Sequence, residues 1–336
     1  MSPGKAFRKG KLLISSLATV VLAAGLILVN LGAAKATFPG PNGKILFTTD
    51  LRSDGQLDRA HTELFSMNSD GTEVVNLTNS PSDYDDFGDW SPDGSKIVFH
   101  RQGSSFRAFA NPNFEIWVMN ADGTGQKRLT TSQLTTDRLP SWSPDGNMIV
   151  FSSNRSDPKP QTCGSSCNFD LFVMSSDGTN VQQLTNSAER ENFPKYSPDG
   201  TKIAFHKRVG GHFAILTINS DGTNVQQVSP SNIDAGSPDW SPDGTKIAFD
   251  TRGCSSCVEH DLYVMDADGS NVTPLTAGFG RNWKPSWSPD GTMIAFSHSE
   301  PGSAIRDIYT IHADGTGTTN LTKSPNFDDA EPDWGA

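Results

Sequence analysis

The sequence predicts an all-β protein, a six-bladed β-propeller of four-stranded antiparallel blades that is closed by its C-terminal strand. Three observations lead to this fold class. A turn motif recurs along the chain, a hairpin motif follows each of its copies, and the chain ends on a piece of the same repeat. A four-stranded repeat of this length is typical of propeller blades.

The first motif is Ser-Pro-Asp-Gly between two apolar runs, as in DWSPDGTKIAF at Asp239–Phe249. Four further copies begin at Asp89, Ser141, Lys195 and Ser286. A shorter copy, PNGKILF, lies at Pro41–Phe47. Serine first, proline second and glycine last is the preference pattern of a type I turn. The flanking residues are β-branched, aromatic or small, which predicts strands covered on both faces.

The second motif is Asp-Gly-Thr or Asp-Gly-Ser between an apolar run and a closing Leu-Thr or Val-Ser. Its six copies are Glu63–Thr78, Glu115–Thr130, Asp170–Thr185, Ala214–Ser229, Asp261–Thr276 and Asp307–Thr322. Asp-Gly between such runs is a strong hairpin signal, because glycine tolerates the positive φ that the turn needs. The aromatic residues of the first motif recur 44 to 54 residues apart, at Trp90, Trp142, Tyr196, Trp240, Trp287 and Trp334. Six turns and six hairpins predict six blades.

The first blade lacks the strand that opens every other blade. That strand is present at the other end of the chain, at Glu331–Trp334. We therefore expect the C-terminus to supply the inner strand of the first blade, which removes the open edges of a linear array. The alternative is a disordered tail.

Residues 1–36 have the pattern of a secretory signal peptide. Basic residues between Lys5 and Lys11 precede an apolar run from Leu12 to about Leu31, and Ala34-Lys35-Ala36 fits a small-x-small cleavage site. We expect an exported protein, periplasmic, at the cell surface or secreted, whose residues 37–336 form one domain. An uncleaved anchor is the alternative. After cleavage no apolar run is long enough to span a membrane.

The net charge is −11. This acidic balance argues against a nucleic-acid partner, because proteins that bind nucleic acid present basic faces. The short turns of the two motifs are expected on one face of the propeller, and the variable connections on the opposite face. Variable loops on a rigid scaffold are where binding sites are commonly placed. We expect a monomer.

The repeat PxWSPDGxxIAFxS, followed by IYxMxxDGxxxxxLT, resembles the propeller repeat of TolB and its relatives over residues 38–334. The resemblance implies a propeller in the cell envelope that binds protein partners through its loop face and channel mouth, without catalysis. TolB carries a mixed α/β domain before its propeller, and this chain has no room for one. We therefore expect a stand-alone TolB-like propeller.

Six equivalent positions, five residues before each inner-strand aromatic residue, are candidates for ligand binding at the channel mouth. They are Asp85, Asp137, Glu191, Ala235, Asn282 and Asp329. Asp234 lies next to Ala235 and can substitute for it. Clustered carboxylates, at Asp85, Asp137, Glu191 and Asp329, would suit Ca²⁺ or another divalent cation, or a basic peptide segment. The alternative is a set of solvated loop carboxylates, partly neutralised by nearby arginine and lysine residues.

The four cysteines form two close pairs, Cys163 with Cys167 and Cys254 with Cys257. Both pairs fall in connections between second and third strands. Because oxidation is the default after export, we expect one local disulfide in each connection. A shared metal site or a redox role for Cys254 and Cys257 are the alternatives.

Catalytic motifs are scarce: the chain has neither a GxSxG elbow nor the HExxH spacing of metal ligands. His100 and His206 directly follow Phe99 and Phe205, at a position that is polar in every repeat, and we interpret them as partly buried structural residues. Phe279 and Trp283 lie in a variable loop and are candidate ligand contacts.

The sequence therefore predicts a non-enzymatic binding scaffold for a protein or peptide partner. The alternative is a metal-dependent propeller enzyme, a polysaccharide lyase or hydrolase. That alternative requires His100, His206 or His298 to converge with the acidic ring.

Overall fold

The computed structural model describes residues 42–50, 61–80, 82–103, 113–131, 134–160, 162–163, 167–251 and 260–336. All described residues belong to one compact unit, Ala33–Ala336, the second of two units into which the chain divides. The predicted signal peptide at residues 1–36 lies outside them, so the signal peptide and the domain boundary at residue 37 stay predictions.

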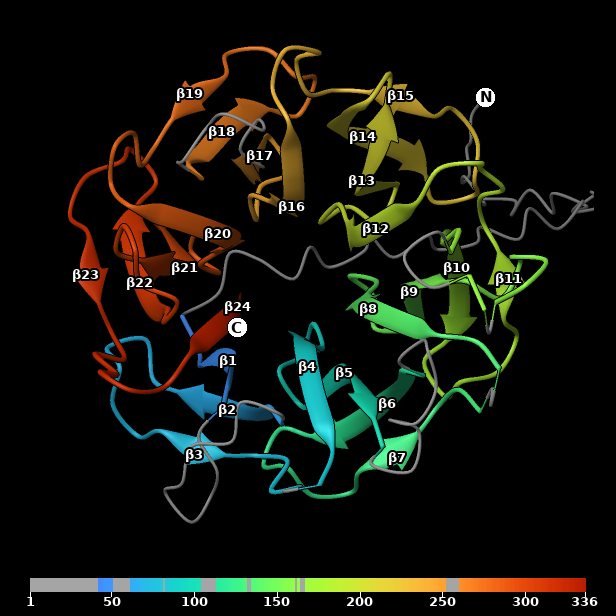
Figure 1. The fold of residues 1–336 in the computed structure, drawn as a ribbon, viewed down its shortest axis with the longest axis horizontal. Helices are drawn as coiled ribbons and strands as arrows, with labels where there is room; N and C mark the ends of the chain where they lie inside the picture. The colour runs from blue at the N-terminus through green and yellow to red at the C-terminus, as the bar shows by residue number, and fades with distance from the viewer. Residues whose placement is uncertain are drawn as a thin grey trace, which may run out of the picture. The chain divides into compact units, whose positions relative to one another are not determined.

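The second unit consists of six antiparallel sheets of four strands, arranged around a common axis in Figure 1. Blade 1 is β24-β1-β2-β3, and blades 2 to 6 are β4–β7, β8–β11, β12–β15, β16–β19 and β20–β23. This confirms the predicted fold class. Among the described residues no helix is long and apolar enough to cross a membrane.

Each blade has the same order of strands from the axis outward. The inner strands are β4 (Tyr84–Trp90), β8 (Asp137–Trp142), β12 (Glu191–Tyr196), β16 (Ala235–Trp240), β20 (Arg281–Trp287) and β24 (Asp329–Trp334). The second strands are β1 (Ile45–Thr49), β5 (Lys96–Gln102), β9 (Met148–Ser153), β13 (Lys202–Val209), β17 (Lys246–Thr251) and β21 (Met293–Ser299). The third strands are β2 (Glu63–Met67), β6 (Glu115–Asn120), β10 (Asp170–Ser175), β14 (His212–Asn219), β18 (Leu262–Asp266) and β22 (Asp307–His312). The outer strands are β3 (Val75–Asn76), β7 (Lys127–Arg128), β11 (Gln182–Gln183), β15 (Gln226–Gln227), β19 (Thr273–Pro274) and β23 (Thr319–Asn320).

The C-terminal strand β24 closes blade 1, as the sequence predicts. It pairs antiparallel with β1, with Trp334 opposite Ile45 and Asp329 opposite Thr49. In Figure 1 the C-terminus lies beside β1 at the inner edge of that blade. The indole of Trp334 is buried with Phe47 in the core that blade 1 shares with blade 6.

The Ser-Pro-Asp-Gly turns are held by hydrogen bonds within the motif. In the first turn the Gly94 amide donates to the Ser91 carbonyl oxygen, 2.8 Å away, and the Asp93 carboxylate accepts from Ser95. Gly94 has a φ of 66°, which an L side chain adopts only with strain. These donors stabilise the ionised aspartate, which lowers the pKa of Asp93. Aspartate and glycine are therefore required by the turn itself.

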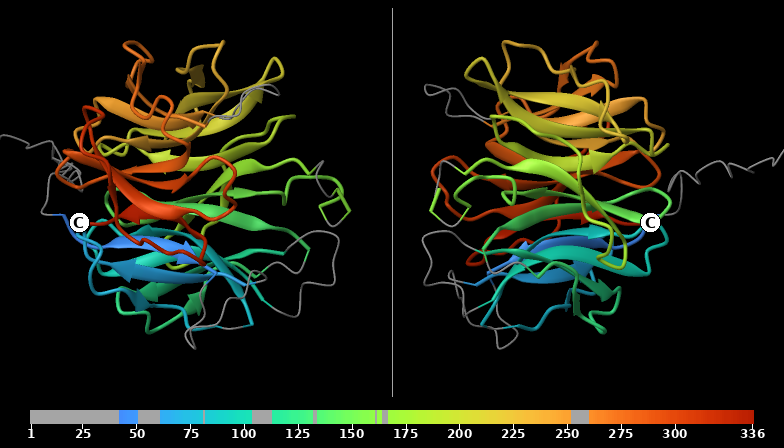
Figure 2. Two further views of the ribbon diagram at one scale, coloured as in Figure 1. Left: turned by 60° about the vertical axis from the view of Figure 1, so that its left-hand side comes forward. Right: turned by 90° about the vertical axis from the view of Figure 1, so that its right-hand side faces the viewer.

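Both families of turns lie on one face of the ring, as the sequence predicts. The backbone shows this directly, since the Ala121 amide of one hairpin turn donates to the Ser95 carbonyl of the neighbouring Ser-Pro-Asp-Gly turn. The side views in Figure 2 show the strands running across the thickness of the ring. We call the face with the turns the turn face. The opposite face, where second strands end and inner strands begin, is the loop face.

The hydrophobic core lies between neighbouring blades. Five phenylalanines of the second strands are fully buried there: Phe99, Phe151, Phe205, Phe249 and Phe296. Each core cluster combines two adjacent blades, as where Trp142 of blade 3 packs with Ile116 of blade 2. Because both sheet faces are covered, the strands carry apolar residues on both sides.

Every inner strand contains a β-bulge three residues before its aromatic residue. In β4, Asp86 pairs with His100 and Asp89 with Val98, so that Phe87 and Gly88 together oppose Phe99. The six bulge residues have φ between 45° and 56°, a left-handed conformation that is uncommon for residues other than glycine. They are Phe87, Leu139, Phe193, Ser237, Lys284 and Glu331. Such bulges re-aim side chains and often border functional sites.

Candidate functional site

Three cavities follow one another along the axial channel, because each shares lining residues with the next. The turn-face cavity has a volume of about 100 Å³, and it shares Asp89 and Lys195 with a central constriction of about 10 Å³. The constriction shares Phe87 and Glu331 with a mouth cavity of about 430 Å³. The mouth cavity lies towards the loop face, since Tyr84 and Asp86 at the beginning of β4 line it.

The turn-face cavity is organised by Lys195. Its ammonium contacts the carboxylate of Asp89 and lies 2.8 Å from that of Asp333, so it joins blade 4 to blades 2 and 1 across the axis. The second oxygens of these aspartates accept backbone hydrogen bonds from the next blade, Asp89 from Trp142 and Asp333 from Trp90. Burial raises the pKa of Asp89 to about 6, and the surrounding carboxylates raise the pKa of Lys195. Lys195 therefore links blades 1, 2 and 4 across the channel.

The central constriction contains a second lysine. The Lys284 ammonium lies 5.6 Å from the ring centre of Phe87 and 5.4 Å from that of Phe193, within the range of cation–π contacts. Burial lowers the pKa of Lys284, and the charge of Lys195 lowers it further. Lysine and phenylalanine together narrow the channel here to the volume of about one water molecule.

The mouth cavity is rich in carboxylates. Among the described residues, four carboxylates and one guanidinium line it: Asp50, Asp86, Asp328, Glu331 and Arg306. Arg306 binds Asp328 at 2.6 Å and lies 3.5 Å from Glu331. Burial raises the pKa of Asp86 to about 7, and the charge of Glu331 contributes. Carboxylates therefore outnumber cationic side chains among the described lining residues, which favours positively charged ligands.

The raised pKa of Asp86 predicts a pH-dependent effect of its replacement. The carboxyl of Asp86 has a pKa of about 7 in the folded protein and about 4 in the unfolded chain. Between these pH values the folded protein keeps the Asp86 proton that the unfolded chain has released, so the stability falls as pH rises. Asp86 therefore lowers the stability of the wild type progressively up to about pH 7, and Asp86→Asn removes that loss. We expect the stability of the variant relative to the wild type to increase by about 2–3 kcal/mol between pH 5 and pH 8, since one pKa unit corresponds to about 1.4 kcal/mol.

Urea unfolding at both pH values measures this difference. Asp122→Asn is the control, because hydrogen bonds from Thr124 lower the pKa of Asp122 and keep it ionised at both. An equal pH dependence of the two variants would contradict a protonated Asp86.

The six predicted positions are buried, and their polar side chains are bound by residues of their own blade or of the preceding connection and blade. Asp85 pairs with Arg101 at 2.8 Å, and Glu191 with Lys207 at 3.0 Å. The three cavities are lined by none of the six ring positions, Asp85, Asp137, Glu191, Ala235, Asn282 and Asp329. The second-strand residues Arg101 and Lys207, directly opposite Asp85 and Glu191 in register, bind these two carboxylates, and a ligand site at the ring stays a prediction.

The remaining members have polar partners of the same kind. Asp137 accepts from Ser153 at 2.6 Å and binds Arg155 at 2.8 Å. Asp329 accepts from Ser324 at 2.6 Å, and burial raises its pKa to about 6. Asp234 accepts from the Phe213 amide at 2.7 Å.

A cation at the acidic ring stays a prediction. Among the residues that the structure describes, no group of three or more His, Cys, Asp or Glu side chains has the geometry of a metal site.

The three histidines named for the enzyme alternative lie in alternate blades. His100 belongs to blade 2, His206 to blade 4 and His298 to blade 6. His100 accepts from the Leu139 amide of blade 3 at 3.2 Å, and burial lowers its pKa to about 3. His298 lies 2.8 Å from the Asn282 side-chain oxygen. The sequence predicts partial burial of His100 and His206, and the structure buries both almost completely.

Their position is polar in every repeat for a reason that the structure shows. In three blades it accepts the amide of the next blade's bulge residue: His100 from Leu139, Asp250 from Lys284, and Ser297 from Glu331. Two other candidate contacts pack against histidines, with Phe279 stacked on His298 and Trp283 beside His260.

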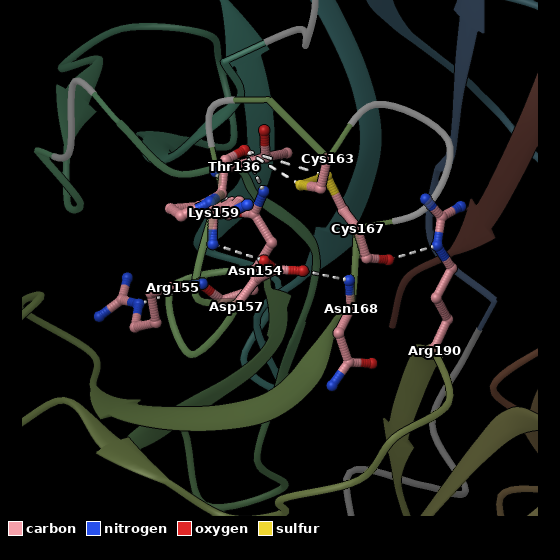
Figure 3. Close-up of a disulfide and its surroundings, with 11 residues drawn as sticks. Thr136, Asn154, Arg155, Asp157, Lys159, Cys163, Cys167, Asn168 and Arg190 are labelled. Atoms are coloured by element: carbon pink, nitrogen blue, oxygen red, sulfur yellow. Dashed lines mark hydrogen bonds between the residues drawn. A yellow bond between two sulfur atoms is a disulfide. The ribbon is translucent and has the colours of Figure 1, made fainter.

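One predicted disulfide is present. Cys163 and Cys167 are bonded, and Figure 3 shows the bond beside Asn154, Asn168 and Arg190. Cys254 and Cys257 lie outside the described residues, so their disulfide stays a prediction.

Sequence reasoning missed the residues that line the channel, namely five of the six bulge residues and the charged residues directly before the inner-strand aromatic residues. Their signal was present in the repeat. At the position before the aromatic residue, Lys195 is the one lysine, and the other repeats have Asp or Ser there. At the bulge position, Lys284 and Glu331 replace the Phe, Leu or Ser of the other repeats.

Comparison with known proteins adds a family and a set of similar folds. The family described as TolB beta propeller domain matches residues 160–336, just over half of the chain. An uncharacterized protein of Agrobacterium fabrum is 32% identical over 116 residues, which are 34% of this chain and 33% of that protein. The chain thus matches about a third of that relative's length.

Three solved structures illustrate the fold. TolB from Acinetobacter baumannii has a TM-score of 0.69 at 22% identity, over 88% of this chain and 68% of that one. A putative TolB from Agrobacterium tumefaciens has a TM-score of 0.61 at 18% identity, over 84% and 89%. An oligogalacturonate lyase in complex with manganese has a TM-score of 0.57 at 14% identity, over 85% and 74%. Because their identities are low, these likenesses show the fold alone.

Proposed function

Because this chain belongs to the TolB β-propeller domain family, we propose that it is a binding scaffold that receives a positively charged segment of a protein partner in its mouth cavity. The segment enters from the loop face. The partner is a protein of the cell envelope, as the resemblance to TolB implies. The protein itself acts outside the cytoplasm, and the disulfide between Cys163 and Cys167 supports an oxidising compartment.

The charge of the mouth cavity carries this proposal. Carboxylates held close together raise one another's pKa, and a bound cation relieves that cost. Burial raises the pKa of Asp86 to about 7, and the charge of Glu331 adds to this shift. At about 430 Å³ the cavity falls within the range of about 300–1,000 Å³ that is common for ligand pockets. A lysine or arginine side chain has the charge that this cavity favours.

A peptide library tests the proposal. One position of an otherwise neutral, fluorescently labelled peptide is varied among Lys, Arg, Gln and Glu, and affinity is read by fluorescence polarisation at low salt. We expect the Lys and Arg peptides to bind at least about tenfold more tightly than the Gln peptide, a difference of about 1.4 kcal/mol. The preference should weaken with added salt, because exposed charges are screened.

Two variants locate the binding site. The double variant Asp86→Asn, Glu331→Gln should lose the preference for cationic peptides, whereas Asp122→Asn on the turn face should retain it. Equal affinity for the Lys and Gln peptides, or a preference that survives the double variant, would overturn the proposal.

A further inference from the structure

Two arginines of neighbouring blades share one aromatic ring at the loop face. The Arg138 guanidinium carbon lies 3.9 Å from the centre of the Phe169 ring, and that of Arg190 lies 5.4 Å from it. Arg138 is the second residue of β8, Arg190 directly precedes β12, and Phe169 directly precedes β10. All three therefore stand where strands begin at the loop face.

Arg138 has no carboxylate partner among the residues that the structure describes. One terminal nitrogen donates to the Asn192 side-chain oxygen at 2.8 Å, and the buried Nε–H has no acceptor among these residues. Other arginines of the propeller form ion pairs: Arg101, Arg128, Arg155 and Arg306. Even Asp137, the sequence neighbour of Arg138, binds Arg155 instead. The charge of Arg138 is thus left for another group to satisfy.

Arg190 is held in place beside it. Its Nε donates to the Cys167 carbonyl oxygen at 2.6 Å, which anchors the side chain to the disulfide-bonded connection, as Figure 3 shows. Burial and the charge of Arg190 lower the pKa of Arg138 to about 10. Like charges at this proximity repel each other, and an anion bound beside them would offset that repulsion.

We propose that Arg138 and Arg190 form an anion subsite for a carboxylate of the partner peptide. The guanidinium fork matches a carboxylate in shape and hydrogen bonding. This inference rests on the proposed function, from which it takes the protein nature of the ligand. The anionic groups of an unmodified peptide are carboxylates.

The subsite adds an opposite charge to the binding face. Asp86 in β4 and Arg138 in β8 occupy the same position of the repeat, four residues before the aromatic residue, in two blades that follow each other in the ring. The partner segment therefore carries a basic residue for the mouth cavity and an acidic residue for the arginines. An acidic polysaccharide is disfavoured, because the mouth cavity and the overall charge of −11 would repel its repeated negative charges.

The first test uses acetate as the probe and the Arg138 Nε–H resonance in NMR as the readout. Arg138→Gln assigns the resonance. We expect a saturable shift on addition of acetate, beyond that of chloride at equal ionic strength, and at least fivefold weaker acetate binding in Arg190→Gln. Arg128→Gln, which removes an arginine already paired with Glu115, should leave acetate binding unchanged. The absence of a saturable shift, or a shift with inorganic phosphate and none with acetate, would overturn the proposal.

The second test uses paired peptides that carry one Lys and, one to five residues away, either Glu or Gln. At one spacing the Glu peptide should bind at least threefold more tightly to the wild type and no more tightly to Arg138→Gln. If the Lys preference holds and no spacing favours Glu, the anion subsite fails and the proposed function stands. If acetate binds and the Lys preference is absent, the proposed function fails instead.

Discussion

Deleting residues 330–336 should unfold blade 1 and cause the largest loss of stability of any short deletion in the propeller. The deletion removes nearly all of β24 and with it the backbone hydrogen bonds to β1. It also removes Trp334, which is buried against blade 6, and loss of a buried tryptophan alone costs about 3–5 kcal/mol. That is a large share of the stability of an ordinary domain, about 5–15 kcal/mol. Thermal unfolding followed by circular dichroism measures the effect.

Point variants separate the role of the indole from that of the strand. Trp334→Ala should lower stability by about 3–5 kcal/mol, and Trp334→Phe, which retains much of the buried surface, by less. Trp334→Ala keeps the β24 backbone, so it remains measurable if the deletion variant fails to fold. A truncated protein that melts at the wild-type temperature would contradict closure by β24.

The fold was predictable because its determinants are local and repeated. Each Ser-Pro-Asp-Gly turn is stabilised by its own serine, aspartate and glycine, so the motif in the sequence already specifies the turn. Closure was predictable for the same reason, since Pro332–Trp334 repeats the inner-strand motif and β1 lacks an inner neighbour. Six copies of one local pattern leave little freedom in how the chain can be arranged.

The candidate site was less predictable because of the β-bulges. In a regular strand, residues one, three and five places before Trp90 would share a face. The bulge at Phe87 and Gly88 breaks this alternation, so Asp89 and Phe87 reach the channel while Asp85 is buried. A left-handed φ at phenylalanine, leucine or lysine cannot be predicted from the residue type, since these residues seldom adopt that conformation.

The partners of the acidic ring did have a signal. Arg101 and Lys207 each lie two residues after the buried phenylalanine of a second strand, and they are directly opposite Asp85 and Glu191 in register. Opposite charges at directly paired positions stabilise antiparallel strands. Aligning each inner strand with its second strand in the sequence would therefore have predicted that Asp85 and Glu191 form ion pairs within their own blades. The mouth cavity has no such signal, because its residues come from blades 1, 2 and 6.

Lys195→Met should destabilise the propeller by about 3–5 kcal/mol, the usual cost of removing one partner from a buried ion pair. Methionine fills similar space but leaves Asp89 and Asp333 without their cation, near Asp239. Both aspartates also accept backbone amides of the next blade, so the variant weakens contacts between blades 1, 2 and 3 together. Urea unfolding measures the loss.

The loss from Lys195→Met should grow as pH rises. Burial already raises the pKa of Asp89 to about 6 although Lys195 lowers it, and without the ammonium that pKa rises further. Between about pH 4 and the raised pKa, the folded variant binds more protons than the unfolded chain, so its stability falls with increasing pH. At pH 5 a protonated Asp89 tolerates the missing cation, whereas at pH 8 Asp89 must ionise without it.

Lys246→Met is the matched control. Lys246 pairs with Asp266 at 2.8 Å on the surface, where such pairs contribute about 0–1 kcal/mol. We therefore expect a small loss from Lys246→Met that is the same at pH 5 and pH 8. If Lys195→Met costs no more than this control, or if its cost does not depend on pH, Lys195 does not tie the blades across the channel. The channel would then be held only by contacts between adjacent blades.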